Sequence, residues 1–229
     1  MTGPATITHR IMRVALSGAG LLAALAYSPP ARHWYLTYGA TDHEASRTMP
    51  GDDLLPDPDL SSTRAISIGA APAAVWPWLV QMGSGRGGAY TYDWVENLFG
   101  LGMHSADEVL PQFQHLAVGD VLPLGANGPG MRVEICDTAT TLAFRSQDHR
   151  WVWIFGLSAE PGGTRLVSRN RIAVPNVSPA RRLVNRMIME PGSLIMERRM
   201  LLGIKQRAES HPQLPSRPGS DPPQASSHP

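Results

Sequence analysis

The chain has 229 residues, which suits one domain of medium size with extensions at its ends. Hydrophobic residues make up 42% of it, enough for a substantial core, and charged residues only 17%, below the roughly one quarter that is usual for soluble domains. The net charge of +1 excludes a strong overall positive field, so nucleic-acid binding is not indicated. The single cysteine, Cys136, excludes an intrachain disulfide.

The N-terminal residues 1–33 contain an uncharged stretch rich in leucine and alanine, Val14–Tyr27, which basic residues precede. Its 14 residues are fewer than the roughly 20 that a membrane span needs. Counting from Ile11, with Arg13 reaching the interface, gives a short single membrane anchor, the interpretation we favour. A signal peptide cleaved near Ala24-Leu25-Ala26, or a plain helix of a cytoplasmic protein, are the alternatives. An anchor or a signal would place the rest of the chain outside the cytoplasm.

Two segments outside the main domain have biased compositions. Residues 34–62 carry Pro50, Pro56 and Pro58 among several aspartates, which predicts an extended linker that wraps the domain. Residues 210–229 are rich in proline and serine and almost free of apolar side chains, which predicts a disordered tail. The domain itself is predicted to span residues 63–209.

The first part of the domain reads as a strand, a helix and a long connection. Arg64–Ile68 is a short strand, and Ala71-Pro72 begins a helix whose apolar residues share one face, with Pro77 expected to kink or shorten it. Gly83–Gly88 breaks the pattern, and a less regular helical segment follows over residues 90–99.

The second part of the domain reads as consecutive antiparallel strands followed by helices. The strands are expected at residues 118–122, 131–136, 141–146, 151–158 and 164–174, with a turn at Pro161-Gly162-Gly163. Two helices then follow, one with a basic side near residues 181–189 and one from Ser193 to Ser210, separated by a break at Pro191-Gly192.

This order of elements resembles a known superfamily. The motif Ala71-Pro72-x-x-Val75-Trp76-x-x-Leu79 after a first strand, and stretches such as residues 78–83, 104–107 and 196–201, are similar to an actinobacterial-type branch of the START-like, or polyketide cyclase/dehydrase and lipid-transport, superfamily (SRPBCC). The resemblance covers residues 34–208. It implies an α+β helix-grip fold, in which a curved antiparallel sheet wraps around a long C-terminal helix and encloses a cavity. It also implies a hydrophobic ligand, and it carries over no catalytic motif.

A helix-grip fold would direct the aromatic residues of the 151–158 strand into such a cavity, although they could equally form plain core. Gly83–Gly88 fits G-x-G-x-x-G, but a helical stretch precedes it, which excludes a dinucleotide fingerprint and leaves either a simple loop or a loop at a pocket mouth where Arg86 faces an anionic group. The candidate ligand-contacting residues are Trp78, Met82, Arg86, Tyr90, Tyr92, Trp94, Trp151, Trp153 and Phe155.

Four residues are weak candidates for acid–base chemistry: Tyr92, Asp93, His104 and Glu197. The first three, with Asp107, could equally brace and cap a loop. Glu197 falls on the apolar side of the last helix, where a carboxylate is costly unless paired, so we expect a salt bridge to a strand arginine such as Arg165, Arg169 or Arg171. A metal site from His104, Asp107 and His115 is disfavoured by its spacing, and no metal or cofactor is predicted.

The favoured function is binding of a small hydrophobic molecule or lipid. Contact with a membrane through residues 11–27 and the basic helix near 181–189 is a second expectation, against the alternative of an ordinary solvated helix face. A cyclase or dehydratase acting on a polyketide-like substrate, and a structural module without ligand, remain as alternatives, so the sequence leaves open whether the protein is an enzyme.

Overall fold

The computed structural model describes residues 27–98, 100–123, 130–175 and 177–210. Its strands are β1 (Leu60–Ile68), β2 (Val121–Leu122), β3 (Met131–Asp137), β4 (Thr141–Ser146), β5 (Trp151–Glu160) and β6 (Gly163–Ile172). Its α-helices are α2 (Pro29–Leu36), α3 (Asp42–Ser46), α4 (Pro72–Val80), α5 (Asp93–Leu98), α6 (Pro179–Val184) and α7 (Glu190–Ser210). Short turns of other helix types are η1 (Asp52–Leu54), η2 (Pro111–Phe113) and the π-helical η3 (Asn185–Met189).

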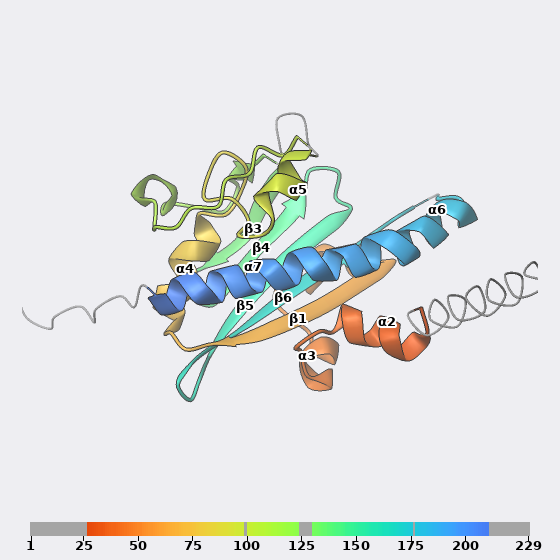
Figure 1. Cartoon of the computed structure of the whole chain (residues 1–229), viewed down its shortest axis with the longest axis horizontal. Helices are drawn as coiled ribbons and strands as arrows, with labels where there is room; N and C mark the ends of the chain where they lie inside the picture. The colour runs from red at the N-terminus through yellow and green to blue at the C-terminus, as the bar shows by residue number, and fades with distance from the viewer. Residues whose placement is uncertain (1–26, 99, 124–129, 176, 211–229) are drawn as a thin grey trace, which may run out of the picture.

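The strands form one antiparallel sheet in the order β1-β6-β5-β4-β3-β2, and the long helix α7 lies across one face of it (Figure 1). This arrangement confirms the predicted helix-grip fold. One strand is shorter than expected: β2 keeps only Val121 and Leu122, because Gly119 (φ +98°) turns the chain just before them.

Side-chain alternation gives the sheet two different faces. On β5, Trp153, Phe155 and Leu157 belong to the core on the side of α4 and α7, whereas Val152 and Ile154 belong to a second core on the opposite side. The helix side is the larger core, and Met200 and Ile204 of α7 are among its buried members.

The opposite face of the sheet is covered by the segment between α2 and β1, and this corrects the expectation of an extended linker. Residues 34–62 do wrap the domain, but they form α3, η1 and the end of α2 and contribute Met49 to the second core. Local signals explain the helices. Thr41 and Glu44 form a capping box at α3, while Pro29 and Pro30 occupy the first turn of α2 behind the N-cap Ser28.

The expected break at Pro191-Gly192 is also wrong. The helix runs without interruption from α6 through the π-helical η3 into α7, and Pro191 lies in the first turn of α7 (Figure 1). A proline has no N–H to give to the carbonyl four residues earlier, here that of Met187. That carbonyl accepts a hydrogen bond from the Tyr27 hydroxyl (2.7 Å). Pro77 likewise lies inside α4, which continues to Val80.

Among the described residues, no helix is long and apolar enough to cross a membrane. The predicted anchor within residues 1–26 and most of the predicted tail, residues 211–229, lie outside the residues that the structure describes.

Candidate functional site

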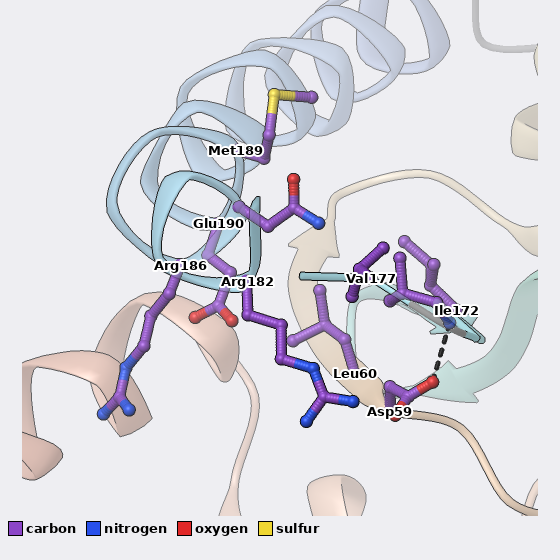
Figure 2. A pocket seen from close by; sticks show the side chains of 10 residues that line it. Asp59, Leu60, Ile172, Val177, Arg182, Arg186, Met189 and Glu190 are labelled. Carbon is purple, nitrogen blue, oxygen red and sulfur yellow. Dashed lines mark hydrogen bonds between the residues drawn. The ribbon is translucent and has the colours of Figure 1, made fainter. Parts of the chain in front are cut away.

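A hollow of about 360 Å³ opens where α6, η3 and the start of α7 pass over the ends of β1 and β6 (Figure 2). Apolar side chains form much of its wall, and charged groups stand around them. The lining residues are Asp59, Leu60, Ile172, Val174, Val177, Arg182, Asn185, Arg186, Met189 and Glu190. The hollow therefore combines an apolar floor with polar edges, as ligand pockets commonly do.

The two acidic groups of this hollow are already engaged. Asp59 accepts a hydrogen bond from the backbone N–H of Val174 (2.7 Å), drawn as the dashed line in Figure 2. Glu190 is buried and accepts two hydrogen bonds from the Arg32 guanidinium (2.8 and 2.9 Å). Glu190 is therefore not available as a free base, and one oxygen of the exposed Asp59 is already hydrogen-bonded.

The two basic groups of the hollow are not engaged in this way. Within the part of the chain that the structure describes, neither Arg182 nor Arg186 forms an ion pair or donates a side-chain hydrogen bond. The two residues are four apart on one helix and both line the hollow. Arg182 extends toward Asp59 and Leu60, whereas Arg186 extends toward α2 on the other side of Glu190, so the positive charge stands at the edges of the hollow (Figure 2). Such an arrangement suits an anionic group on a largely apolar molecule.

A second hollow, of about 480 Å³, adjoins the first and shares Ile172, Val174 and Val177 with it. Its wall includes Trp151, which connects the site to the helix-facing side of β5. The remaining lining residues are Ser146, Asp148, Arg150, Ala173, Pro175, Ser178 and Arg181.

Trp151, Trp153 and Phe155 form an aromatic row along β5. Trp151 and Trp153 are stacked with their ring centroids 5.6 Å apart, and Phe155 follows at 4.8 Å. The indole N–H of Trp151 donates to Asn170 (2.8 Å) and that of Trp153 to Ser168 (3.0 Å). Both tryptophans are half-buried and Phe155 is fully buried, so the row runs from the second hollow into the core.

The polar partners of these tryptophans converge on Glu197 of α7. Its carboxylate accepts hydrogen bonds from Ser168 (2.6 Å) and Asn170 (3.3 Å) and forms an ion pair with the fully buried Arg64 of β1. Burial raises the pKa of Glu197, and the Arg64 charge and the Ser168 hydroxyl act against that rise. A carboxylate bound on this many sides links helix to sheet and is not a free acid.

The expected salt bridge of Glu197 to a strand arginine is therefore present, but the arginine is Arg64. The three arginines suggested for the role, Arg165, Arg169 and Arg171, occupy odd positions of β6 and face the side of the sheet opposite α7. The segment between α2 and β1 that covers this side, residues 37–59, is called the outer layer, and the three arginines pair with its Glu44 and Asp52. Ser168 and Asn170 occupy even positions and face α7. Arg64, Ser168 and Asn170 were not among the predicted partners of Glu197, although the alternation along β6 separates the residues that face α7 from those that face away from it.

Three of the other candidate ligand contacts are part of the core. Trp78, Met82 and Tyr90 are all buried and belong to the helix-side core, and the hollows described above are lined by other residues. The Tyr90 hydroxyl donates to the carbonyl of Trp78 (2.9 Å), and burial raises the pKa of Tyr90. The structure gives these side chains a packing role.

Arg86 lies against its own loop and not at the mouth of either hollow. Its guanidinium donates to the carbonyls of Val80 (2.9 Å) and Phe113 (3.2 Å) and stacks on the Phe113 ring. Gly83–Gly88 is thus a braced loop between α4 and the following segment. Tyr92 and Trp94, nearby, are both exposed.

The candidate acid–base residues near α5 form bracing contacts. Asp93 accepts hydrogen bonds from the backbone N–H (2.8 Å) and the hydroxyl (2.5 Å) of Ser105. The exposed His104 precedes this contact, and Asp107 pairs with Arg207 of α7 (2.7 Å). These contacts match the capping and loop-bracing alternative. The described residues contain no cluster of three or more His, Cys, Asp or Glu side chains that could hold a metal.

No protein-family model and no curated protein matches this chain. Several solved structures are similar to it. Protein MLL2253 from Mesorhizobium loti is 18% identical with a TM-score of 0.41 and covers 66% of this chain and 98% of its own. The polyketide_cyc-like protein Cgl2372 from Corynebacterium glutamicum is 14% identical with a TM-score of 0.37, covering 69% and 95%. The AHSA1-like protein from Aeromonas hydrophila is 17% identical with a TM-score of 0.36, covering 66% and 93%.

The fold assignment itself rests on the strand order and the long C-terminal helix of this chain.

Proposed function

We propose that this chain binds a small hydrophobic or lipid-like molecule in the hollow beneath α6 and η3. The observation that carries the proposal is the pairing of an apolar floor with Arg182 and Arg186, two arginines that have no ion-pair partner among the described residues. An apolar tail would contact Leu60, Ile172 and Val177, and an anionic end would lie near the two guanidinium groups.

A binding role fits this site better than catalysis does. An enzyme of the cyclase or dehydratase type needs titratable groups that converge on its substrate and remain free to exchange protons. In this hollow Asp59 and Glu190 are both hydrogen-bonded, and Glu197 is held by Arg64 outside it. Binding requires only the shape and the charge that the hollow offers.

Titration of the full chain with a fluorescent fatty acid, and with the matching fatty alcohol, tests the proposal. We expect Val177→Trp, which fills the hollow, to abolish binding of both. The double variant Arg182→Gln with Arg186→Gln should lower the affinity for the fatty acid by about tenfold or more, because a charge-assisted hydrogen bond contributes about 1.5–3 kcal/mol. It should leave the affinity for the fatty alcohol nearly unchanged. Arg132→Gln, an exposed arginine on β3, is the matched control.

The outcomes are separable. If neither probe binds the full chain, or if Val177→Trp binds both as well as the unaltered chain does, the hollow is not the ligand site. Native mass spectrometry of the chain from a lipid-containing host, followed by organic extraction, would then show whether any lipid is bound elsewhere.

A further inference from the structure

The helix over the hollow exposes a row of large apolar side chains. Leu183, Val184, Met187 and Ile188 are between 37% and 62% exposed, although residues of these types are usually buried. They recur at spacings of one, three and four residues and so lie on one face. Ile195, seven residues after Ile188 and 60% exposed, extends this row onto α7. We call these five residues the outer apolar row.

The apolar and charged sides of this helix are arranged differently from those of an ordinary surface helix. A surface helix directs its apolar side to the core and its charges to water. Here Arg182 and Arg186 line the hollow, whereas the residues of the outer apolar row are exposed and are not among those that line it. Such an arrangement is stable when something apolar covers the outward face.

The positive charge around the outer apolar row favours an anionic partner. Residues 179–189 contain three arginines, Arg181, Arg182 and Arg186, and no acidic residue. A helix with an apolar row flanked by arginines is suited to the boundary between lipid headgroups and acyl chains of an anionic membrane. Each basic residue near such a surface adds to the attraction.

The place where the apolar N-terminal stretch joins the domain also favours a membrane as the partner of the outer apolar row. The Tyr27 hydroxyl donates to the carbonyl of Met187, a residue of the outer apolar row, and Arg32 pairs with Glu190 one turn further on. The uncharged residues 14–27 therefore end beside this face. A bilayer that receives the N-terminal stretch would lie against the outer apolar row as well.

We propose that the outer apolar row docks onto the surface of an anionic lipid bilayer. The proposal goes beyond ligand binding, because the row lies outside the hollow and its docking does not require the hollow to be occupied. It brings the helix that walls the hollow to the membrane surface, since Arg182 and Arg186 belong both to the docking helix and to the wall of the hollow.

An environment-sensitive fluorophore on the row tests this docking directly in the full chain. Cys136→Ser removes the native thiol, Ile188→Cys places a nitrobenzoxadiazole label on the row, and Ala159→Cys places it at the exposed β5–β6 hairpin as the matched control. With vesicles of phosphatidylcholine and phosphatidylglycerol in a two-to-one ratio, we expect a blue shift and a rise in emission at 188 and none at 159. Leu183→Glu added to the labelled chain should remove the shift.

Three results would overturn the docking surface. The label at 188 could keep its aqueous emission even when the chain floats with the vesicles. Vesicle binding would then be due to the N-terminal stretch and not to the outer apolar row. The emission of the label at 188 could already be blue-shifted before any vesicle is added, which would show that the chain itself covers the outer apolar row. An equal shift with pure phosphatidylcholine would overturn the anionic assignment. None of these results affects the fatty-acid titration, so failure of either proposal can be recognised separately.

Discussion

Arg64 and Glu197 are the residues whose loss should disturb the fold most. Both are buried and paired, and Arg64 also donates to the carbonyl of Tyr35 (3.0 Å) and to Ser193 (2.9 Å). Removing one member of a buried ion pair leaves the other charge without compensation. We expect Glu197→Gln to lower the free energy of unfolding by about 3–5 kcal/mol in urea denaturation.

A variant that removes both charges distinguishes the contribution of the ion pair from the cost of leaving one charge buried without its partner. Arg64→Met with Glu197→Leu removes both charges, so we expect a loss clearly smaller than the sum of the two single losses. Additive losses would show that the two residues act independently, and the ion pair would then not be what joins α7 to β1.

Glu44 makes the stability of the fold depend on pH in the acidic range. The hydrogen bond from Arg165 lowers the pKa of Glu44 from 4.5 to about 2, and the Thr41 N–H adds to this effect. A lowered pKa stabilises the fold fully above the unfolded value and progressively less as the pH falls toward the folded value. The difference in urea midpoint between the unaltered chain and Glu44→Gln should therefore shrink between pH 4.5 and about 2.

Asp53, an exposed carboxylate on η1, offers the control for this measurement. Asp53→Asn should show only a small difference in urea midpoint. If the Glu44→Gln difference stays constant from pH 6 to pH 2, the Arg165–Glu44 pair does not stabilise the fold.

At the scale of elements, local patterns in the sequence were enough for the sheet and for α4. Strands β3 to β6 follow the alternation of apolar side chains, and α4 begins where Ala71-Pro72 predicts it. The continuous helix through Pro191 was not predictable in this way, because a proline usually ends or kinks a helix, whereas here the helix continues from the π-helical turn η3 through Pro191. The partner of Glu197 required the pairing of β1 with β6, which is a long-range contact that no local pattern encodes.

The outer layer is the element whose attachment can be tested most directly. Arg169 donates to Asp52 (2.6 Å) and to the carbonyls of Glu44 (2.7 Å) and Arg47 (2.9 Å), so one side chain fastens α3 and η1 to the sheet. We expect Arg169→Met to speed amide hydrogen exchange in peptides from residues 41–55 and to leave α7 unchanged, as measured by mass spectrometry.

Arg132→Met, at an exposed position of β3, is the comparison for that experiment. Faster exchange throughout the sheet and α7 would show that Arg169 supports the whole fold and not the outer layer in particular.

At the scale of the whole molecule, two cores share one sheet, and the outer core depends on chain that precedes β1. Val152, Ile154 and Val167 have no exposed surface, and Met49 packs on them from the outer layer. Exposing each of the three would cost about 1.5–3 kcal/mol, and their sum is comparable with the whole stability of an ordinary domain, about 5–15 kcal/mol. The sequence-predicted domain start at residue 63 would leave this face uncovered.

Truncation therefore decides where the domain begins. We expect a chain of residues 27–210 to unfold in urea as one cooperative unit, with tryptophan fluorescence from the helix-side core and far-ultraviolet circular dichroism changing together. A chain of residues 60–210 should instead aggregate or lack a cooperative transition, because Arg165, Arg169 and Arg171 also lose their partners. If the shorter chain unfolds cooperatively at the same urea concentration, the outer layer is dispensable and the helix-grip fold is complete from β1 onward.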